Sequence, residues 1–447
     1  MAQFTVQDIL QATGGTCTGD NSIQFADVST DTRTIEADYL FVALRGDTFD
    51  GHDFIKTAIE KGAIGAIVEN GHSVEGILCI EVENTLKAYQ DLANFHRHRF
   101  NIPIVAITGS SGKTTTKEMV AAVLSTEFNV LKTEKNFNNE IGLPKTLLQL
   151  TNEHEACVVE MGMRGLGQIE ELALIAEPTI GIITNVGTSH IELLGSKEAI
   201  GEAKGELIRC LGTDSISILN EDDSFVSAMS AIAKGKTMTY GIHSNATIKG
   251  SHLRYKKDGI KFTCKAYDDV FDVFLPMIGE HNVYDALAAI AAGRALGVKP
   301  SKIKKGLSEF TGTPMRQEIV AFDDIVILND AYNANPSSMA EAIKALGQLD
   351  GKRKIAMLGD MLELGDFTEE GHRQIGRLLG EEKYSVLFTF GDAADFIAKE
   401  AKLVGLEVHR CNSHLEMANA YQDIREKGDV ILVKDLVGLE RSVLLEK

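Results

Sequence analysis

Short apolar runs alternate with amphipathic stretches along most of the chain. The apolar runs are typical of buried strands, and apolar residues at helical spacing between them indicate covering helices. In the first part of the chain, the pattern predicts helices at Phe4–Ala12, with Thr5 as N-cap, and at Phe54–Lys61 and Leu86–Phe100. It predicts strands at Ile23–Val28, Tyr39–Leu44 and Ala63–Val68.

The same alternation continues through the middle and the last part of the chain, which predicts mostly parallel sheets covered on both faces. Apolar and polar residues alternate with period two around Asp258-Gly259 and Asp268-Asp269, which favours antiparallel strands. Helices are expected at Lys197–Leu211, from Gly279 to near Gly297, and from Met339. The predicted strands are Ile104–Thr108, Ala156–Glu160, Thr179–Asn185, Ser215–Leu219, Ile260–Cys264, Val270–Phe274, Ile325–Asn329, Lys354–Leu358, Val386–Phe390 and Val430–Val433.

Two turn-rich segments divide this α/β pattern. Asn101-Ile102-Pro103 ends a helix with a basic end, and Thr311-Gly312-Thr313-Pro314 separates the second and third groups of strands. A chain of 447 residues is too long for a single core. We therefore predict three domains, at residues 1–100, 101–313 and 314–447.

Composition and charge narrow the class of protein. The formal net charge of −19 argues against a general binder of nucleic acid or anionic membrane. No apolar run approaches the ~20 residues of a membrane span, and the first residues lack the features of a signal peptide. The six cysteines are scattered without a Cys-x-x-Cys pair, so we expect a cytoplasmic protein without a cysteine metal site.

A glycine-rich turn follows the predicted strand Ile104–Thr108 and precedes a helical pattern. Glycines let the backbone wrap around an anion, and the N–H groups at a helix start point at it. Lys113 would reach the terminal phosphates, and the Thr114 hydroxyl would bind Mg²⁺. The spacing of the glycines is tighter than in the standard phosphate-loop pattern, because the position of that pattern's first glycine is occupied by Ile107 here. The alternative interpretation of the whole segment is an ordinary strand–turn–helix without a bound phosphate. The residues expected to bind the nucleotide are Gly109, Ser110, Ser111, Gly112, Lys113, Thr114 and Thr115.

Polar residues also follow other predicted strands, where ligands of parallel sheets bind. Glu160 ends one apolar run and His190 follows another, so a carboxylate and an imidazole beside a phosphate loop suggest a divalent-metal site. The alternatives are a surface carboxylate and a loop histidine. Lys204, judged by spacing alone, belongs to a solvated charged helix face. Asn282, at a predicted helix start, either caps the helix or contacts a nucleotide.

Two polar loops near the N-terminus carry hydroxyl groups and an arginine each. These loops are Thr30-Asp31-Thr32-Arg33 and Arg45-Gly46-Asp47-Thr48-Phe49-Asp50-Gly51-His52, and both follow predicted strands. Hydroxyls, backbone N–H groups and arginines suit a phosphorylated ligand. Two solvated loops are the alternative.

Taken together, these motifs resemble the Mur ligase family, and most of all its branch that adds D-alanyl-D-alanine to UDP-N-acetylmuramoyl-tripeptide. The phosphate loop is shared across Mur ligases and folylpolyglutamate synthases, whereas Asp330–Pro336 and Leu358–Gly365 point to that branch. The resemblance covers the whole chain in order. It also rests on Asn136–Gly142, Glu160-Met161-Gly162, Asn185–His190, Gly279–Asn282 and Arg316.

The resemblance implies a UDP-sugar domain, a central ATPase domain and a C-terminal Rossmann-like domain that closes over the site. It implies one Mg²⁺ on Thr114 and Glu160, a second on His190, and a carbamylated Lys204 that bridges the metals. Catalysis is expected from Lys113, Glu160, His190 and Lys204. Further ATP contacts are expected from Asn282, Arg316 and Asp330, and contacts to the substrates from Thr30, Asp31, Thr32, Arg33, Arg45, Gly46, Asn138, Asn139, Asn335 and Lys434.

The activity that the resemblance implies is an ADP- and phosphate-forming peptide ligase of peptidoglycan synthesis, acting through an acyl phosphate. Its partners would be ATP, Mg²⁺, UDP-N-acetylmuramoyl-tripeptide and D-alanyl-D-alanine, and a bacterial cytoplasmic monomer is expected. The alternatives are a related amide ligase for another amino acid, a homologue that binds nucleotide or UDP-peptide without turnover, and an unrelated phosphate-loop ATPase.

Two positions depart from the family pattern. Asp285 replaces a usual asparagine near the phosphates, so a carboxylate stands where an amide is expected. The family's Lys-Gly-Ser-Arg-Gly stretch reads Lys434-Asp435-Leu436-Val437-Gly438 here. A bulkier, more acidic loop without the arginine is expected to weaken acceptor binding or domain closure.

Overall fold

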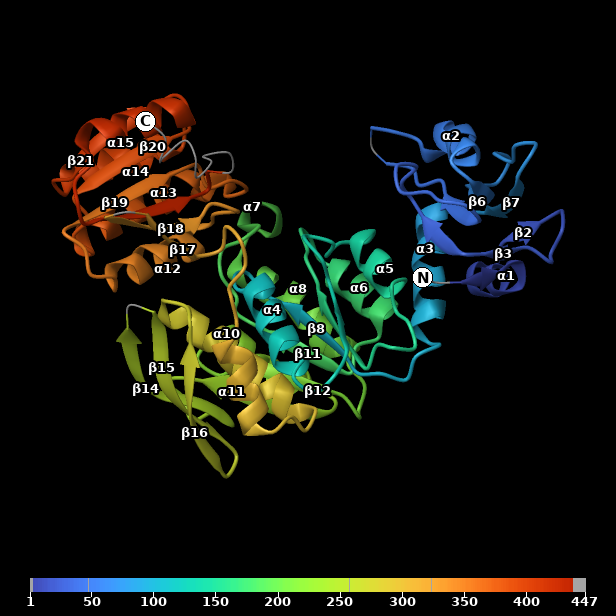
Figure 1. Cartoon of the computed structure of the whole chain (residues 1–447), viewed down its shortest axis with the longest axis horizontal. Coiled ribbons are helices and arrows are strands. Elements are labelled where there is room, and N and C mark those ends of the chain that lie inside the picture. Colours follow the sequence, from blue (N-terminus) through green and yellow to red (C-terminus); the bar gives the residue numbers. More distant parts are fainter. Residues whose placement is uncertain (1–2, 47, 257, 323, 437–447) are drawn as a thin grey trace. The chain divides into compact units, whose positions relative to one another are not determined.

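The computed structural model describes residues 3–46, 48–256, 258–322 and 324–436, and the chain forms two compact units. Among the described residues, the first unit holds 3–106, 128–162 and 168–179, and the second holds 107–127, 163–167 and 180–436. The division passes through strand β8 (Ile104–Thr108). Both units are built from sheets and covering helices (Figure 1), so the predicted α/β class is confirmed. The three predicted domain boundaries stay a prediction.

The first unit begins with a five-stranded sheet of order β2-β7-β6-β5-β4. Strands β4 to β7 pair in parallel and β2 is antiparallel to β7. Its strands are β2 (Thr16–Cys17), β4 (Asp27–Ser29), β5 (Tyr39–Val42), β6 (Ala63–Glu69) and β7 (Leu78–Val82), and its helices are α1 (Val6–Thr13), η1 (Gly51–Phe54), α2 (Ile55–Glu60) and α3 (Thr85–Arg97).

Helix α1 begins at the predicted cap. The Thr5 side chain accepts a hydrogen bond from Asp8 N at 3.1 Å, and the Asp8 carboxylate accepts one from Thr5 N at 2.8 Å. This reciprocal pair satisfies two N–H groups that a helix start leaves without partners. The helix therefore starts at Val6 and not at Phe4, which lies in the short strand β1 (Phe4–Thr5).

The predicted strand Ile23–Val28 is wrong, because this run forms two strands in different sheets. β3 (Gln24–Phe25) pairs with β1, and β4 pairs with β5. Phe25 packs so closely on Gly65 that a Cβ there would lie 2.4 Å from its ring. One apolar run thus serves two partners, which its periodicity does not reveal.

The rest of the first unit contains β9 (Val130–Lys132) and β10 (Ala156–Glu160), which pair in parallel. Its helices are α5 (Gly142–Leu147) and α6 (Gln168–Ala176), and both contact α3. Strand β10 has the predicted bounds and is buried along its whole length.

The second unit contains a run of parallel strands, β11 to β14, that continues into the antiparallel strands β14, β15 and β16. The expected antiparallel edge is therefore confirmed. The strands are β11 (Ile180–Ile183), β12 (Ile216–Asn220), β13 (Lys236–Gly241), β14 (Ile248–Lys256), β15 (Gly259–Ala266) and β16 (Asp269–Leu275). The helices are α4 (Lys113–Leu124), α7 (Ile191–Leu194), α8 (Lys197–Cys210), α9 (Ser224–Ala228), η2 (Met229–Ile232), α10 (Glu280–Ala295) and α11 (Pro300–Ser308).

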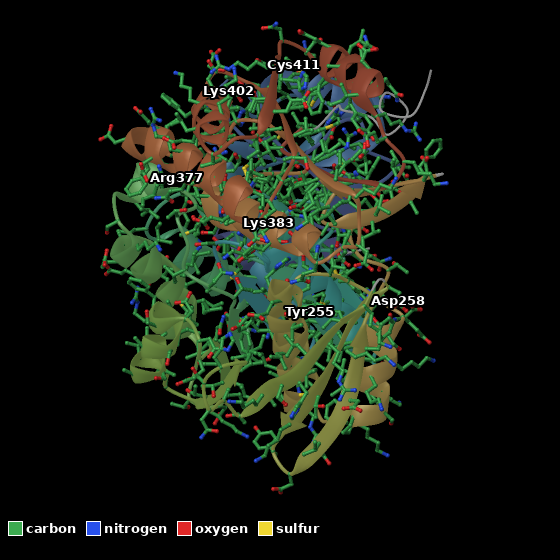
Figure 2. All side chains as sticks on the ribbon, turned by 90° about the vertical axis from the view of Figure 1, so that its left-hand side faces the viewer. Tyr255, Asp258, Arg377, Lys383, Lys402 and Cys411 are labelled. Carbon is green, nitrogen blue, oxygen red and sulfur yellow. The ribbon has the colours of Figure 1, made fainter. Side chains whose placement is uncertain are left out.

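The last sheet, drawn in orange and red in Figure 1, has the order β17-β18-β22-β19-β20-β21. All of its pairs are parallel except β17 with β18, so the predicted parallel sheet is confirmed. Its strands are β17 (Glu318–Phe322), β18 (Ile325–Asp330), β19 (Arg353–Leu358), β20 (Val386–Phe390), β21 (Glu407–Cys411) and β22 (Asp429–Lys434). The helices are α12 (Pro336–Gly347), η3 (Gly365–Phe367), α13 (Thr368–Glu381), α14 (Ala394–Leu403) and α15 (His414–Ile424). Figure 2 labels Arg377 on α13 and Lys402 on α14, two helices that pack against each other.

Candidate active site

The glycine-rich turn between β8 and α4 has the shape expected of a phosphate loop. Gly112 has φ +76°, in the left-handed region, and a Cβ there would lie 2.6 Å from Asp285 Oδ1. A Cβ at Gly109 would lie 1.7 Å from Thr184 Oγ1. Neither position therefore has room for a side chain, and the backbone is left accessible where an anion would approach.

Residues that follow β11 hold this loop in place. Asn185 accepts from Ser110 N through its backbone oxygen at 3.1 Å and from Ser111 N through Oδ1 at 2.9 Å. Thr184 Oγ1 donates to Ser111 O at 2.6 Å, and Lys113 Nζ donates to Gly109 O at 2.7 Å. The loop is thus preorganised by the protein itself. No role was predicted for Thr184 from the sequence, and its position at the end of a buried strand was the available signal.

A second set of hydrogen bonds joins the loop to the C-terminal sheet's first helix. Gly187 N donates to Ser110 Oγ at 2.8 Å, and Ser189 Oγ donates to Ser110 O at 3.1 Å. Asn335 Nδ2 in turn donates to Ser189 Oγ at 2.9 Å. Asn335 is also the N-cap of α12, accepting from Ser338 N at 2.9 Å. Asn335 therefore reaches the phosphate loop through one intervening hydroxyl.

A pocket of about 470 Å³ opens beside the loop. This volume lies in the usual range for small-molecule sites, and both aromatic and hydrogen-bonding side chains line it. Tyr255, labelled in Figure 2, comes from β14, whereas other walls come from α10 and α12. The lining residues are Ser111, Gly112, Thr184, Asn185, Asn220, Asp222, Asp223, Tyr240, Tyr255, Gly279, Glu280, His281, Tyr284, Asp285, Glu341, Lys344, Ala345 and Gln348.

Asp222 fixes one wall of this pocket. Its carboxylate accepts from the backbone N–H groups of Ile242, His243 and Ser244 at 2.6–2.9 Å, and from Tyr284 Oη at 2.9 Å. Burial alone would raise the pKa of Asp222, but these hydrogen bonds outweigh burial and hold the pKa below its usual value. Burial and the hydrogen bond to Asp222 raise the pKa of Tyr284, which stays a neutral phenol.

Asp285 lies behind the loop, where Oδ1 accepts from Thr116 Oγ1 at 2.7 Å. Burial raises the pKa of Asp285 to about 8, the Thr116 hydrogen bond opposes this shift, and the charge of Glu341 adds to it. At neutral pH this side chain is therefore mostly protonated. A neutral carboxylic acid occupies the place where the family usually has a neutral amide, which removes the charge conflict that the sequence suggested.

Replacing Asp285 with asparagine is expected to change how stability depends on pH. The pKa of this carboxyl is 3.8 ordinarily and about 8 in the fold. Its contribution to the free energy of unfolding is therefore complete below about pH 4 and is lost progressively as the pH rises to about 8. Asp285→Asn removes this loss, which amounts to at most ~1.4 kcal/mol per pH unit. Unfolding temperatures measured from pH 5 to pH 9 test this prediction. The unfolding temperature of the variant is expected to rise relative to that of the parent until about pH 8. The control is Asp268→Asn in an exposed turn, and parallel curves for Asp285→Asn and the parent would contradict the prediction.

His190 begins α7 with a left-handed backbone, φ 62°. Its Nδ1 lies 2.6 Å from Glu363 Oε2, and Arg164 Nη2 lies 3.5 Å from Glu363 Oε1. Burial lowers the pKa of His190, Glu363 opposes this shift, and the positive charges of Lys113 and Lys204 add to it. The imidazole is therefore neutral, as a metal ligand must be. No role was predicted for Glu363 from the sequence.

Lys204 lies on α8 and is 1% exposed, so its interpretation as part of a solvated charged face is wrong. Glu206 is buried with it and accepts from Gly167 N at 2.7 Å. Burial, and then the charge of Lys113, lowers the pKa of Lys204 well below its usual value. Lys204 and Glu206 thus belong to the interior, which sequence spacing does not reveal.

Glu160 ends β10 in the first unit and is 3% exposed, so it is not a surface carboxylate. Asn138 Nδ2 donates to Glu160 Oε1 at 2.8 Å, and Glu160 N donates to Thr133 Oγ1 at 3.1 Å. Asn139 Oδ1 accepts from Gly142 N at 2.9 Å, which closes the turn before α5. Asn138 therefore contacts the predicted metal-binding carboxylate directly, whereas Asn139 shapes the loop.

Asn282 is not a helix cap, because α10 is capped by the backbone of Gly279 without a side-chain hydrogen bond. Its Nδ2 donates to Ile278 O at 2.6 Å and to Gln317 Oε1 at 2.8 Å. Asn282 is also absent from the pocket lining, where its neighbour His281 lies. Its contact with ATP stays a prediction.

Asp330 and Lys434 lie opposite each other on the parallel strands β18 and β22 and form a buried ion pair. Lys434 Nζ also donates to Asn333 O at 3.1 Å. Arg316 stacks on the Tyr332 ring, with Cζ 4.2 Å from the ring centroid. The predicted ribose and acceptor residues are therefore brought together, and the roles of Asp330, Lys434 and Arg316 stay predictions.

The stretch that departs from the family pattern begins at Lys434 in this ion pair and continues after β22. Asp435 has φ 56°, and burial raises its pKa to about 6, with Lys434 opposing the shift. Leu436 is buried in the core of this sheet. Val437 and Gly438 lie outside the described residues. Leu436 is thus a packing residue, and the effect of this stretch on closure stays a prediction.

The N-terminal loops carry internal ion pairs. Arg33 Nη2 lies 2.7 Å from Asp31 Oδ2, and the Arg33 side chain is 87% exposed. Arg45 pairs with Asp50 and with Glu69 at 2.9 and 2.8 Å. The other predicted residues here are Thr30, Thr32 and Gly46, whose N–H donates to Phe49 O at 2.9 Å. Their contact with UDP stays a prediction.

The predicted metal ligands fit Mg²⁺ by their donor chemistry. A hydroxyl, a carboxylate and a neutral imidazole are supplied by Thr114, Glu160 and His190. Among the described residues, no group of three or more His, Cys, Asp or Glu side chains gathers as a metal cage. Few protein donors per ion are typical of Mg²⁺ in phosphate-transfer sites, where phosphate and water complete the coordination.

Three family models match this chain. Residues 107–293 match the Mur ligase middle domain, 315–434 the domain described as "Mur ligase, glutamate ligase domain", and 24–122 the domain described as "Mur ligase family, catalytic domain". A UDP-N-acetylmuramoyl-tripeptide–D-alanyl-D-alanine ligase of Bacillus subtilis (strain 168) is 38% identical over 455 residues, covering 100% of this chain and 98% of that one. The ligase of the same name from Synechocystis is 40% identical, covering 92% and 89%.

Solved structures agree with these relatives. A crystal structure of MurF from Acinetobacter baumannii matches with a TM-score of 0.92 at 30% identity, covering 99% of this chain and 98% of that one. MurF ligase from Thermotoga maritima in complex with ADP matches with a TM-score of 0.85 at 28% identity, covering 94% and 96%.

The chain belongs to the Mur ligase family and is an ATP-dependent ligase. Within that family, the relatives that match it over most of its length are D-alanyl-D-alanine-adding ligases. No helix of the described residues is long and apolar enough to span a membrane.

Proposed function

We propose that this chain joins D-alanyl-D-alanine to UDP-N-acetylmuramoyl-tripeptide, with ATP converted to ADP and phosphate. The observation that carries the proposal is the preorganised loop Gly109–Thr115 beside a pocket of about 470 Å³. This loop occurs in a chain that matches two UDP-N-acetylmuramoyl-tripeptide–D-alanyl-D-alanine ligases over 98% and 89% of their length. In the bacterial cytoplasm, this reaction would supply a peptidoglycan precursor.

The first chemical step forms an acyl phosphate. A carboxylate oxygen of the tripeptide attacks the γ-phosphorus of ATP, the bond to the ADP oxygen breaks, and ADP leaves. Lys113 and the backbone N–H groups of the loop stabilise the charge on the transferred group. When bound at Thr114 and Glu160, with a second ion at His190, Mg²⁺ supplies further neutralisation of the phosphate charge.

The second step forms the amide. The amine of D-alanyl-D-alanine attacks the acyl carbon, the carbon–oxygen bond to phosphate breaks, and the amine gives up a proton. Holding both substrates in line provides much of the rate enhancement. We assign this positioning to Asn138, Asn139, Asn335 and Lys434 for the peptides and to Asn282, Arg316 and Asp330 for ATP. The loops Thr30–Arg33 and Arg45-Gly46 would bind the UDP end.

Lys204 is proposed to carry a carbamate. Carbon dioxide adds to a neutral amine, and burial keeps the pKa of Lys204 well below its usual value, so that the neutral form is available. The product is a carboxylate, which is a suitable ligand for Mg²⁺. Without such a modification, the buried amine would either lose its proton or carry a charge in the interior at a high energetic cost.

The test measures phosphate release while ATP, UDP-N-acetylmuramoyl-tripeptide and D-alanyl-D-alanine are omitted one at a time. The complete mixture is expected to release one phosphate for each amide formed, and each omission to stop amide formation. A panel of single amino acids in place of the dipeptide separates this activity from that of a related ligase. Phosphate release that needs ATP alone would contradict the ligase assignment. The absence of turnover when ATP and both peptide substrates are present would favour a binding protein.

A further inference from the structure

Glu363 has no part in the reaction described above, yet it makes the shortest polar contact of His190 among the described residues. Its Oε2 lies 2.6 Å from His190 Nδ1. Its other oxygen, Oε1, lies 3.5 Å from Arg164 Nη2. Each carboxylate oxygen therefore faces a different nitrogen-bearing side chain, and the carboxylate has a defined orientation.

The backbone on both sides of this contact is unusual. His190 has φ 62° and Glu363 has φ 59°, and non-glycine residues rarely adopt this left-handed region. Two residues further on, Gly365 packs against α7 so closely that a Cβ would lie 2.9 Å from Glu192 Cγ. Strained conformations persist where the surroundings determine them, and they gather at functional sites.

The residue before His190 is held in the same way. Asn335 Nδ2 donates to Ser189 Oγ at 2.9 Å, as Glu363 contacts His190. Two consecutive residues of the segment that follows β11 are thus each held by a side chain from the C-terminal sheet's loops. This arrangement fixes the position of the segment relative to the phosphate loop, to which Ser189 is also bonded.

A neutral imidazole has one N–H and one lone pair, and the partner of the N–H decides which nitrogen can bind a metal. Metal-binding histidines usually donate their second nitrogen to a carboxylate, which fixes the ring and raises its basicity. We infer that Glu363 is a positioning residue: it accepts the Nδ1 proton of His190 and leaves Nε2 as the metal-binding nitrogen. This inference rests on the proposed role of His190 as a Mg²⁺ ligand.

The competing explanation is a partly exposed polar contact without consequence for the metal. The side chains of His190 and Glu363 are 26% and 37% exposed, and polar contacts between such side chains contribute little to stability. A pair of this kind would leave metal affinity unchanged. Metal affinity therefore separates the two explanations, whereas stability does not.

The experiment titrates the full-length protein with Mn²⁺ in the presence of ADP and follows free Mn²⁺ by electron paramagnetic resonance. Glu363→Ala is expected to weaken one Mn²⁺ site by about 10- to 100-fold and to leave the other unchanged. Glu363→Gln keeps an acceptor oxygen and is expected to weaken the same site less. The matched control is Glu192→Gln, which removes the same charge from an exposed residue of α7 and should bind Mn²⁺ like the parent.

His190→Ala is measured in parallel to separate this inference from the function on which it rests. If His190→Ala weakens a Mn²⁺ site and Glu363→Ala does not, the positioning role is overturned and the metal role of His190 stands. If His190→Ala changes the affinity of neither Mn²⁺ site, both the positioning role of Glu363 and the metal-binding role of His190 are refuted. Circular dichroism reports folding, and where Glu363→Ala is poorly folded, a parent-like affinity of Glu363→Gln counts against the role of the carboxylate.

Discussion

Replacing Lys113 with alanine is expected to lower kcat by about 10²- to 10³-fold, or ~3–4 kcal/mol in transition-state stabilisation. Lys113 opens α4, and its Nζ donates to Gly109 O at 2.7 Å, so its charge is held at the phosphate loop. The charge of the transferred phosphoryl group is the main quantity that the protein must stabilise. Single-turnover phosphate release with all substrates present measures the loss.

The control for this variant is Lys197→Ala. Lys197 is exposed at the start of α8, so its removal lowers the net charge equally without touching the loop. Lys113→Arg is informative as well, because it keeps a positive charge but changes the reach and geometry of the side chain. Activity of Lys113→Ala within tenfold of the parent, with folding intact, would show that the loop does not stabilise the reacting phosphate.

Replacing Lys204 with alanine has the second largest expected effect. Lys204 is 1% exposed, and burial lowers the pKa of its amine well below the usual value, which favours the neutral form. If its carbamate binds metal, the variant is expected to lose about 10²-fold in activity or more, the loss that follows removal of groups around a bound metal. Activity of the parent is expected to fall when dissolved carbon dioxide is removed and to return with bicarbonate.

A spectroscopic measurement makes this second prediction independent of activity. Protein prepared in ¹³C-bicarbonate is expected to show a carbamate resonance that is absent from Lys204→Ala and present in Lys197→Ala. ADP binding by Lys204→Ala, measured by calorimetry, confirms that the phosphate loop remains intact. A parent without the resonance and without a bicarbonate response would refute the carbamate, and the site would then need another ligand.

Much of the fold followed from local patterns. The capping pair of Thr5 and Asp8 is separated by one helical turn, and β8 and β10 have the predicted bounds because each is a buried apolar run. The error at Ile23–Val28 has a physical cause. Phe25 packs on Gly65, whereas Val28 pairs with Leu40, so one apolar run belongs to two sheets.

The residues of the candidate site also fall into those that the sequence predicts and those that only the tertiary structure reveals. Gly109–Thr115 could be predicted because glycine, lysine and threonine follow one another within a single turn, and the required backbone freedom is a local property. The strand ends indicated His190 as a candidate metal ligand, whereas only the resemblance to Mur ligases supplied Lys204, which spacing alone would have left as an ordinary polar residue. Neither pattern nor resemblance supplied the contact of Glu363 with His190 or the wall built on Asp222.

The sequence by itself determined the α/β class, the phosphate loop and the family, because these depend on residues close together in the chain and on motifs in a fixed order. The tertiary structure alone decided which charged groups are buried and which protons they hold. The pKa of Lys204 lies well below its usual value and that of Asp285 lies well above its own, because elements far apart in sequence exclude water from both groups. Desolvation depends on every neighbour in space, and no local pattern of residues encodes it.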